Sequence, residues 1–550
     1  MSTQSAASTS SSTSAPSARV AFVGAGPGDP GLLTVRARDY LSAADVVVLD
    51  SLHRAEEVRR YTRTDAEILD GRQGESGKAL TPASRASLVV RTARRFSDHG
   101  MLVVRLMDGD PSAFSGLTTE ALACSKAGVP FEIVPGVSTA WSVPAYAGVP
   151  LTGRGVRELH MINAGDTKTD WSLSVADDIT VVLLGAPGDL RKSLLGLRKA
   201  GRDVQTPVAL TEHGTTVTQH THVTCLDDAV EQLAGDELGE VSVAVVGEQV
   251  ALRGELSWYE SKPLFGWHIL VPRTQDQAGP MRERIAAYGA TAAVVPTISV
   301  EPPRTPQQMD KAIKGLVTGR YEWVGFTSVN AVRAIREKFT ECGLDARAFA
   351  GLKIAAVGGV TAEALREWGL EPDLMPEQEQ SARGLLEAWP PFDDVLDPIN
   401  RVLLPRADIA TDTLVAGLQQ IGWHVDDVTA YRTVRATPPP APVREAIKGG
   451  EFDAVCFTSS STVRNLVGIA GKPHPCTVVA CIGPATARTA EEHGLRVDVV
   501  APEASSASLI DALAAHAGDV ADATTQAGEE VLRPSQRRPA GRRAQPKARA

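Results

Sequence analysis

Short runs of strand-forming residues alternate with segments of helical pattern along almost the whole chain of 550 residues. The runs before residue 248 include "RVAFVG", "ADVVVLD", "MLVVRL", "ITVVLLG" and "VSVAVVG", and those after it include "WHILVP", "WVGFTS", "KIAAVG", "RVLLP" and "TVVACIG". Such alternation predicts α/β layers with mostly parallel sheets. Many of these runs end in Gly, Pro, Ser or Asp, and open α/β sheets bind ligands at the carboxyl ends of their strands.

Composition excludes several classes of protein. No apolar run reaches the ~18 residues of a membrane span. Residues 1–18 are rich in Ser, Thr and Ala without the apolar centre of a secretory signal, so we expect a disordered tail there. The six cysteines form no C-x-x-C pair, a pattern typical of a cytoplasmic protein, and it gives no reason to expect a metal site.

Charge is distributed unevenly. The net charge is −10, but residues 531–550 hold seven Lys and Arg and no acid, so the remainder carries −17. A strongly acidic body argues against nucleic acid as a partner. We expect residues 517–550 to form a disordered basic tail.

Beyond a boundary near residues 262–267 the chain repeats itself. "LVPRTQDQAG" resembles "LLPRADIATD", "GFTSVNAVRAI" resembles "CFTSSSTVRNL", and "AVGGVTAEALREWGLEPDLMP" resembles "CIGPATARTAEEHGLRVDVVAP", in the same order both times. This repetition predicts two similar α/β halves with a ligand cleft between them.

The loop "GAGPGDPGLL", residues 24–33, resembles a dinucleotide fingerprint only superficially. The third glycine of G-x-G-x-x-G would fall at Asp29, whose carboxylate would repel a pyrophosphate, and Pro27 removes a backbone N–H. Asp50, "MDGDPSAFSG" (107–116) and the small-residue stretch 134–155 also follow strand-like runs. Each alone is typical of a cap or a turn, but together they favour a site for a cationic or polar ligand.

Residues 19–265 carry "GAGPGDPGLLTVRA", "GDP", "PFEIVPGVSTA", "PAYAGVPLTGRG", "TPVALTEHGTT" and "VVGEQVALRGELSWYESKPLFG". These motifs resemble, in order, those of uroporphyrinogen-III C-methyltransferase. The resemblance implies a tetrapyrrole methylase fold of two α/β/α subdomains over 19–262, an S-adenosylmethionine cofactor and a homodimer. It implies these cofactor contacts: Pro27, Asp108, Gly109, Asp110, Ala113, Ser138, Thr139, Leu184 and Gly214. Asp50 matches the family's proton acceptor, and Arg72 stands where the family has a lysine proton donor.

Three positions depart from the family pattern. Asp108 replaces the usual first glycine of Gly-Gly-Asp-Pro, so it needs more room and adds a charge, and Leu184 replaces a methionine. Arg72 is too basic to donate a proton at neutral pH, although it can hold a substrate carboxylate.

Residues 266–516 carry "VPRT", "GFTSVNAV", "AVGGVTA", "LLPRADIATDTL", "VTAYRTV", "CFTSSSTV" and "CIGPATA". They resemble uroporphyrinogen-III synthase, a two-domain α/β enzyme that closes linear hydroxymethylbilane with inversion of the last ring and needs no cofactor. The resemblance implies that 266–300 pack with 435–516 while 301–434 form the second domain. Tyr431 matches the tyrosine thought to assist loss of the hydroxyl. The candidate ligands for the eight substrate carboxylates are Arg273, Thr327, Ser328, Thr361, Arg406, Thr458, Ser459 and Thr486.

Together the two resemblances predict one bifunctional enzyme, which makes uroporphyrinogen III and methylates it to precorrin-2. Two alternatives stay open: an active synthase joined to a degenerate methylase, and a two-lobed tetrapyrrole-binding protein without turnover. Both cobalamin and sirohaem biosynthesis are open as end uses. No membrane partner is expected.

Overall fold

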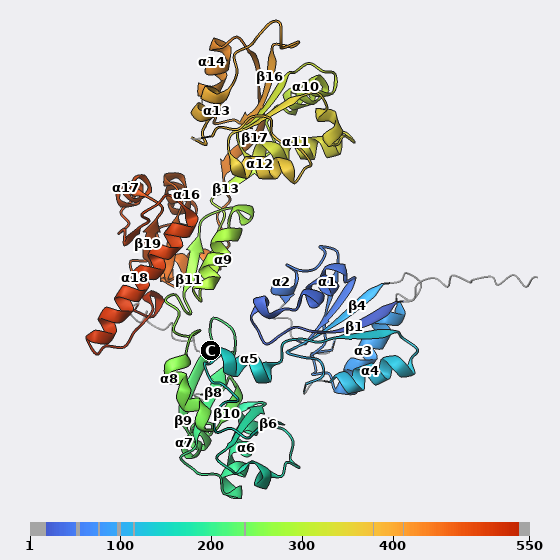
Figure 1. Cartoon of the computed structure of the whole chain (residues 1–550), viewed down its shortest axis with the longest axis vertical. Helices are drawn as coiled ribbons and strands as arrows, with labels where there is room; N and C mark the ends of the chain where they lie inside the picture. The colour runs from blue at the N-terminus through green and yellow to red at the C-terminus, as the bar shows by residue number, and fades with distance from the viewer. Residues whose placement is uncertain are drawn as a thin grey trace, which may run out of the picture. The chain divides into compact units, whose positions relative to one another are not determined.

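The computed structural model describes residues 18–50, 55–74, 77–95, 101–113, 116–235, 238–377, 379–410 and 412–537 (Figure 1). The chain forms an N-terminal unit, Met1–Gly266 with Tyr288–Ala290, and a C-terminal unit, Trp267–Ala287 with Thr291–Ala550. The predicted α/β class is confirmed in both units. Residues 1–17 and 538–550 of the predicted tails lie outside the described residues.

The first sheet of the N-terminal unit is wholly parallel and has the strand order β3-β2-β4-β1-β5. Its strands are β1 (Arg19–Gly24), β2 (Val46–Leu49), β3 (Glu67–Asp70), β4 (Leu102–Met107) and β5 (Phe131–Val134). Alternate side chains of β1 point to opposite faces, as in any strand. Val23 packs with helix α1 (Val35–Ala43), and Phe22 packs with α3 (Pro82–Arg95) and α4 (Leu117–Lys126). Helices therefore cover both faces of this sheet.

The second sheet of this unit is an exception to the mostly parallel pairing that the sequence predicts and that the other sheets show. Its order is β6-β7-β10-β8-β9, and only β6 and β7 pair in parallel. The strands are β6 (Glu158–Asn163), β7 (Ile179–Leu184), β8 (Pro207–Glu212), β9 (His220–Cys225) and β10 (Val241–Val246). The connection from β8 to β9 is too short for a crossover helix, so these strands must run antiparallel. Helices α6 (Pro187–Ala200) and α7 (Leu226–Gln232) cover one face and α5 (Thr139–Tyr146) the other.

The first lobe of the C-terminal unit is built from both ends of that unit's sequence. Its parallel sheet has the order β12-β11-β18-β19-β20. The strands are β11 (His268–Val271), β12 (Thr291–Val294), β18 (Ala454–Phe457), β19 (Val478–Cys481) and β20 (Val499–Val500). The helices are α9 (Gly279–Ala287), α15 (Ala441–Gly449), α16 (Ser460–Ala470), α17 (Pro484–Glu492) and α18 (Ser506–Gln526).

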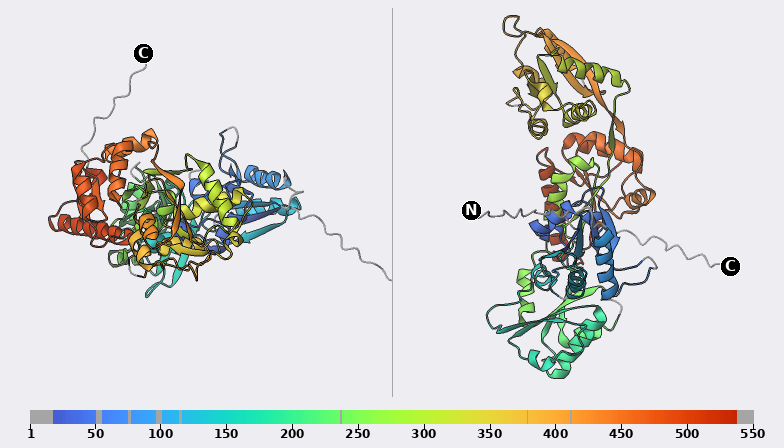
Figure 2. Two further views of the ribbon diagram at one scale, coloured as in Figure 1. Left: turned by 90° about the horizontal axis from the view of Figure 1, so that it is seen from above. Right: turned by 90° about the vertical axis from the view of Figure 1, so that its right-hand side faces the viewer.

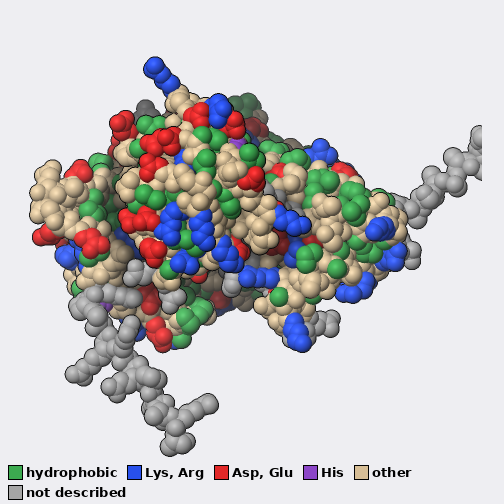
Figure 3. Space-filling view, turned by 90° about the horizontal axis from the view of Figure 1, so that it is seen from below, with side chains coloured by type: hydrophobic (Ala, Val, Ile, Leu, Met, Phe, Trp, Pro, Cys, Tyr) green, Lys and Arg blue, Asp and Glu red, His purple; other side chains and the backbone are tan. Residues whose placement is uncertain are grey.

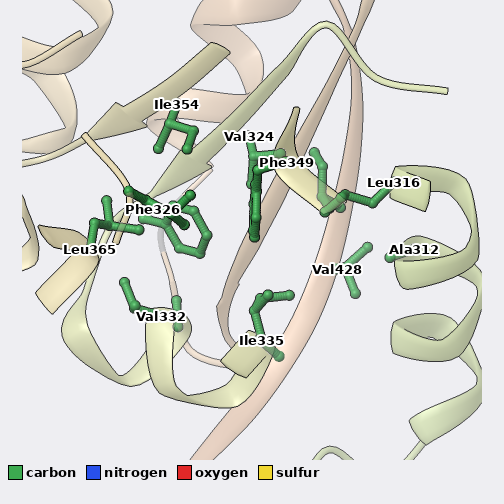
Figure 4. Close-up of a cluster of buried hydrophobic side chains, with 14 of the residues drawn as sticks. Ala312, Leu316, Val324, Phe326, Val332, Ile335, Phe349, Ile354, Leu365 and Val428 are labelled. Carbon is green, nitrogen blue, oxygen red and sulfur yellow. The ribbon is translucent and has the colours of Figure 1, made fainter. Parts of the chain in front are cut away.

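The second lobe has the strand order β13-β17-β16-β14-β15. Its strands are β13 (Ile298–Glu301), β14 (Trp323–Phe326), β15 (Lys353–Ala356), β16 (Arg401–Ala407) and β17 (His424–Arg435). The helices are α10 (Pro306–Val317), α11 (Val329–Glu341), α12 (Gly359–Arg366), α13 (Ala382–Ala388) and α14 (Thr413–Gln420). Val324 and Phe326 of β14 pack with Val332 and Ile335 of α11 in a buried cluster (Figure 4).

A two-stranded ribbon joins the lobes, and it moves the expected boundaries. The antiparallel pair of β13 and the end of β17 runs between the lobes in Figures 1 and 2. The expected breaks at 300/301 and 434/435 therefore fall inside paired strands. Because β13 is hydrogen-bonded to β17 along its length, residues from Ile298 onward belong with the second lobe.

The prediction of a disordered tail from residue 517 is wrong for residues 517–526. Helix α18 continues to Gln526, because alanines favour helix and Leu513, Ala514 and Ala517 are buried against the lobe. A short turn of 3₁₀ helix, Pro534–Arg537, then follows, and the backbone N–H of Ser535 donates to Asp453 Oδ1 at 2.9 Å.

Among the described residues, none of the helices combines the length and apolar character that crossing a membrane requires. Acidic and basic side chains are interspersed on the face shown in Figure 3.

Candidate functional site

Three glycines bring the loops at the carboxyl edge of the first sheet into contact. Gly24 ends β1, Gly109 follows β4 and Gly136 follows β5. A Cβ added to Gly24 would lie 2.5 Å from the Gly136 Cα, and one added to Gly136 would lie 2.3 Å from the Gly109 carbonyl oxygen. Because these neighbours are backbone atoms, no larger residue fits without moving a loop. The glycines of "GAGPGDP" and "PGVST" therefore serve close packing of loops.

Asp29 shows why the opening loop carries an acid where a dinucleotide fold has glycine. Its Oδ1 accepts from the Gly31 N–H at 2.7 Å, and its Oδ2 accepts from the Tyr146 hydroxyl at 2.7 Å. Its own N–H donates to Thr215 Oγ1 at 3.1 Å. The carboxylate thus ties the first sheet's loop to α5, and the backbone N–H ties it to the loop after β8.

Asp110 braces the neighbouring loop in the same way. Its Oδ2 accepts from the Gly136 N–H at 2.8 Å, and its Oδ1 accepts from the Ser112 N–H at 2.8 Å and from the Ser112 hydroxyl. Burial opposes the charged form, but these hydrogen bonds outweigh it and hold the pKa of Asp110 below its usual value. Asp110 is therefore a charged brace between the loops after β4 and β5.

A cavity of about 290 Å³ opens beside these loops. Its lining includes seven of the nine predicted cofactor contacts: Asp108, Gly109, Asp110, Ala113, Ser138, Thr139 and Leu184. The other two, Pro27 and Gly214, are not in the lining. Gly214 instead packs on α5, where an added Cβ would lie 2.4 Å from the Val143 Cγ2.

Sequence reasoning missed three lining residues, Asn163, Gly185 and Ser242. Asn163 ends β6 and Gly185 follows β7, so both stand at the carboxyl ends of strands of the second sheet. A polar residue at a strand end was the available signal for Asn163. The described lining contains no Lys, Arg or His side chain. Its charged side chains are two aspartates, which suits a cation and not a phosphate.

Asp50 and Arg72 follow neighbouring strands, β2 and β3, at the same edge. The Arg72 N–H donates to Asp70 Oδ1 at 2.7 Å, and its side chain is exposed. Asp50 Oδ1 accepts from Arg105 Nη2 at 2.5 Å, and the Asp108 N–H lies 3.4 Å from Asp50 Oδ2. Asp50 is not in the cavity lining itself, but it contacts Asp108, which is.

In the C-terminal unit, Tyr431 stands where β17 leaves β16 for the ribbon. Its hydroxyl lies 2.9 Å from Ser328 Oγ, and the side chain is 7% exposed. The pairing of β17 with β16 shifts register between Arg406 and Ala407, so Ala430 and Tyr431 are buried in succession. A bulge of this kind re-aims a side chain. Tyr431 lines a cavity of about 480 Å³ together with residues of β13, α10 and α11.

The two predicted arginines have different surroundings. Arg273 Nη1 donates to Ser506 Oγ at 3.0 Å, and burial lowers its pKa. Arg406 is 6% exposed and forms a fork to Asp427, with 2.5 Å between Nε and Oδ1. It also lies 3.2 Å from Asp412 Oδ1, and the hydrogen bonds to Asp427 raise its pKa. Two carboxylates therefore already pair with Arg406, and its predicted contact with substrate stays a prediction.

The predicted hydroxyl ligands separate into two groups. Ser328 caps α11 by accepting from the Ala331 N–H, and Ser459 caps α16 by accepting from the Thr462 N–H. Thr327 and Thr458 are half-buried beside these caps. Thr361 and Thr486 lie inside the first turns of α12 and α17 and are each 4% exposed. Because they are buried, the hydroxyls of Thr361 and Thr486 are not open to a ligand in this conformation.

These residues are distributed over both lobes. Thr327, Ser328, Thr361, Arg406 and Tyr431 belong to the second lobe, and Arg273, Thr458, Ser459 and Thr486 belong to the first. Of the nine, only Tyr431 lines the 480 Å³ cavity.

Two family models match the chain. The model described as Tetrapyrrole (Corrin/Porphyrin) Methylases matches residues 19–230, and that described as Uroporphyrinogen-III synthase HemD matches residues 279–511.

Several known proteins are similar to this chain. The porphyrin biosynthesis protein HemD of Ruminiclostridium josui is 32% identical over 505 residues, which cover 90% of this chain and 97% of the relative. The uroporphyrinogen-III C-methyltransferase of Bacillus subtilis (strain 168) is 27% identical over 368 residues, covering 66% of this chain and 74% of the relative. A crystal structure of uroporphyrin-III-C-methyltransferase from Thermus thermophilus is 31% identical, with a TM-score of 0.36, and covers 44% of this chain and 98% of its own. The chain belongs to the family of the porphyrin biosynthesis protein HemD, and it joins a tetrapyrrole methylase segment to a uroporphyrinogen-III synthase segment.

Proposed function

We propose that the chain catalyses two consecutive reactions. The C-terminal unit cyclises hydroxymethylbilane to uroporphyrinogen III, and the N-terminal unit methylates that product to precorrin-2. The observation that supports this most strongly is the gathering of seven predicted cofactor residues around one cavity in a chain that also carries a synthase segment.

The cavity of the N-terminal unit fits S-adenosylmethionine, which supplies the methyl group when bound. A sulfonium cation is favoured by nearby carboxylates, and Asp108 and Asp110 are the only charged residues in the described lining. The loops that follow β4 and β5 bring backbone to the cavity at Gly109, Ser138 and Thr139, where it can hydrogen-bond an adenine or a ribose. Asp108, Asp110, Ser138, Thr139 and Leu184 would hold the cofactor, with Pro27 and Gly214 in the adjoining loops.

Asp50 receives the proton that the substrate ring releases after methylation. Its carboxylate lies next to Asp108, which lines the cavity, so a tetrapyrrole bound at the cavity mouth can reach it. Arg72 stays charged and holds a substrate carboxylate, since a guanidinium is not a proton donor at neutral pH. Its exposed side chain on the neighbouring strand end suits that role.

In the C-terminal unit, Tyr431 assists the departing hydroxyl group. A phenol donates a hydrogen bond to an oxygen as negative charge develops on it. Tyr431 lines the cavity with its hydroxyl next to Ser328, so the two hydroxyls can share or relay that hydrogen bond. The helix starts at Ser328 and Ser459, together with Arg273, bind substrate carboxylates.

We also propose that the N-terminal unit forms the homodimer that the family resemblance implies. Strand β5 is an edge strand, and its Phe131 and Ile133 are 36% and 46% exposed. Light scattering on the purified chain tests this. A monomer at micromolar concentration contradicts it.

The purified chain given hydroxymethylbilane, with and without S-adenosylmethionine, tests the bifunctional proposal. We expect uroporphyrinogen III without the cofactor and precorrin-2 with it, identified by mass and by isomer. If the cofactor leaves uroporphyrinogen III unmethylated and calorimetry detects no binding, the chain is a synthase joined to a degenerate methylase. If only the type I isomer forms while hydroxymethylbilane binds, the C-terminal unit is a binding protein without turnover.

A further inference from the structure

Four charged side chains form a continuous chain of ion pairs inside the N-terminal unit. Arg85 Nε on α3 lies 2.6 Å from Glu120 Oε1 on α4, and Glu120 Oε2 lies 2.8 Å from Arg105 Nε on β4. Arg105 Nη2 then lies 2.5 Å from Asp50 Oδ1, after β2. The Arg105 and Glu120 side chains are both fully buried. Neither "MLVVRLM" nor "GLTTEALA" marks these two residues as functional.

Arg105 uses each of its nitrogens. Besides the two carboxylates, its Nη1 donates to the Leu106 carbonyl oxygen at 2.6 Å. Burial disfavours its charge, but Asp50 and Glu120 outweigh burial and raise the pKa of Arg105. The guanidinium is therefore a permanent charge held at a fixed position in β4. A fixed donor of this kind also fixes the carboxylate that it contacts.

The two oxygens of Asp50 consequently differ. Oδ1 is held by Arg105 at 2.5 Å, whereas the Asp108 N–H lies 3.4 Å from Oδ2, at the limit of a hydrogen bond. The Asp50 side chain is 27% exposed, so a substrate can approach it. An oxygen already held by a guanidinium is a poor proton acceptor, which leaves Oδ2 as the basic atom.

We propose that Arg105 is a positioning residue for methylation, which fixes Asp50 through Oδ1 and leaves Oδ2 to accept the ring proton. This inference rests on the proposed role of Asp50. In that step the N–H bond of the methylated, positively charged ring breaks, its electron pair stays on the ring nitrogen and neutralises the ring, and the proton forms an O–H bond with Oδ2. Glu120, itself shared with Arg85, sets how strongly the Arg105 charge acts on Asp50.

The charges around Asp50 define the expected direction of a pH effect. Among the described residues, β4 contributes Arg105 and its following loop Asp108, α4 contributes Glu120, and the end of β3 contributes Asp70 and Arg72. Removing an opposite charge disfavours a carboxylate, typically by one to three pH units at contact distance. In a plot of methylation rate against pH, the acid limb is the part where the rate falls as Asp50 becomes protonated. Arg105→Gln should therefore move this limb upward by about one pH unit or more.

Two further variants keep the test decisive if Arg105→Gln folds poorly. Glu120→Gln leaves Arg105 in place and directs more of its charge to Asp50, so the acid limb should move downward. Arg105→Lys retains the charge but loses the fork, so the limb should stay near wild type while kcat falls roughly tenfold. Arg85→Gln is a graded test, because Arg85 contacts Glu120 without contacting Asp50 in any described interaction. It frees Glu120 to act more fully on Arg105, so the limb should move upward by less than in Arg105→Gln, and thermal stability should fall.

The measurement is the single-turnover rate of methylation of supplied uroporphyrinogen III between pH 5 and 9, at saturating S-adenosylmethionine, with cofactor affinity measured by calorimetry. Opposite shifts in Arg105→Gln and Glu120→Gln, with cofactor affinity retained, support the inference. A wild-type acid limb in both variants, when Asp50→Asn removes that limb, overturns the role of Arg105 alone. A wild-type limb in Asp50→Asn overturns the proposed role of Asp50 itself, which separates the two failures.

Discussion

The candidate sites of the two units are built from different materials. In the N-terminal unit, loops locked together by glycines surround one cavity, and the described lining carries two aspartates and no cationic side chain. In the C-terminal unit, the candidates are hydroxyls and arginines on two separate sheets. The first arrangement suits a small cation held by backbone, and the second suits a large polyanion that spans lobes. The two candidate sites therefore differ in the charge of the ligand that their side chains suit.

The largest expected effect that distinguishes the two units is the loss of methylation when Asp50 is replaced. Asp50→Asn keeps size and removes basicity, so methylation should fall by roughly 10²–10⁴-fold with cofactor affinity retained. Synthase rate should be unchanged, because Asp50 belongs to the other unit. Arg72→Lys serves as the control and should retain activity. Wild-type turnover in Asp50→Asn would reduce Asp50 to a strand-end partner of Arg105.

The counterpart in the C-terminal unit is Tyr431→Phe, which should lower the synthase rate by roughly 10²-fold without abolishing it. Closure can proceed slowly without help, so more substrate should escape and close spontaneously to the type I isomer. Chromatography of the III-to-I isomer ratio at fixed enzyme measures this. Ser328→Ala tests the neighbouring hydroxyl and should have a smaller effect, and methylation of supplied uroporphyrinogen III should be normal. An unchanged ratio and rate in Tyr431→Phe would remove this residue from catalysis.

The two predicted substrate-binding arginines, Arg273 and Arg406, allow a test inside the C-terminal unit. Arg273 contacts Ser506, and no ion pair to it is recorded in the described part of the chain, whereas Arg406 is held by Asp412 and Asp427. Arg273→Gln should raise the KM for hydroxymethylbilane by roughly tenfold, since a charge-assisted hydrogen bond contributes about 1.5–3 kcal/mol. Arg406→Gln should mainly lower thermal stability, because it leaves carboxylates unpaired. The reverse pattern would assign substrate binding to Arg406.

A smaller effect on stability and cofactor affinity is expected at Gly136, where the loops after β4 and β5 pack together. Gly136→Ala places a Cβ 2.3 Å from the Gly109 carbonyl oxygen, so a loop must shift at a cost of about 1–3 kcal/mol in the free energy of unfolding. Cofactor affinity should fall with it, as followed by calorimetry. Gly188→Ala is the matched control, since an added Cβ there meets nothing within 4 Å. Equal behaviour of the two variants would show that the loop contact is unimportant.

The smallest expected effect is the loss of stability at low pH that Asp110 causes. The lowered pKa of Asp110 exists only in the folded protein, so its stabilisation is complete above the ordinary aspartate pKa of about 3.9. It is lost as the pH falls through the lower folded value. Thermal melts from pH 6 to 3 should therefore decline more steeply for the wild type than for Asp110→Asn. Parallel curves would mean that the hydrogen bonds to Gly136 and Ser112 contribute nothing measurable.

Much of the lining of the 290 Å³ cavity could be predicted because the family resemblance implies those residues, and most of them follow parallel strands whose carboxyl ends meet at one edge. Asn163, Gly185 and Ser242 could not, since no family motif marks them as contacts and the strand pattern does not reveal the mixed pairing of the second sheet. Arg105 was hidden inside an apolar run, and its burial depends on Glu120, which lies in another element. The bulge at Ala430 likewise has no local signal, yet it sets the side of β17 on which Tyr431 lies.

The first lobe of the C-terminal unit has a consequence for how the chain is synthesised. Its central pair joins β11 to β18, and the His268 N–H donates to Asp453 Oδ2 across 185 residues. The ribosome therefore completes the second lobe while β11 and β12 still lack their central partner strand. Contacts of such long range form slowly and leave strand edges open to wrong partners. A chain that ends at residue 435 would leave the edge of β11 without its partner β18. A fragment that is meant to contain the first lobe must therefore include both of the sequence segments that form it.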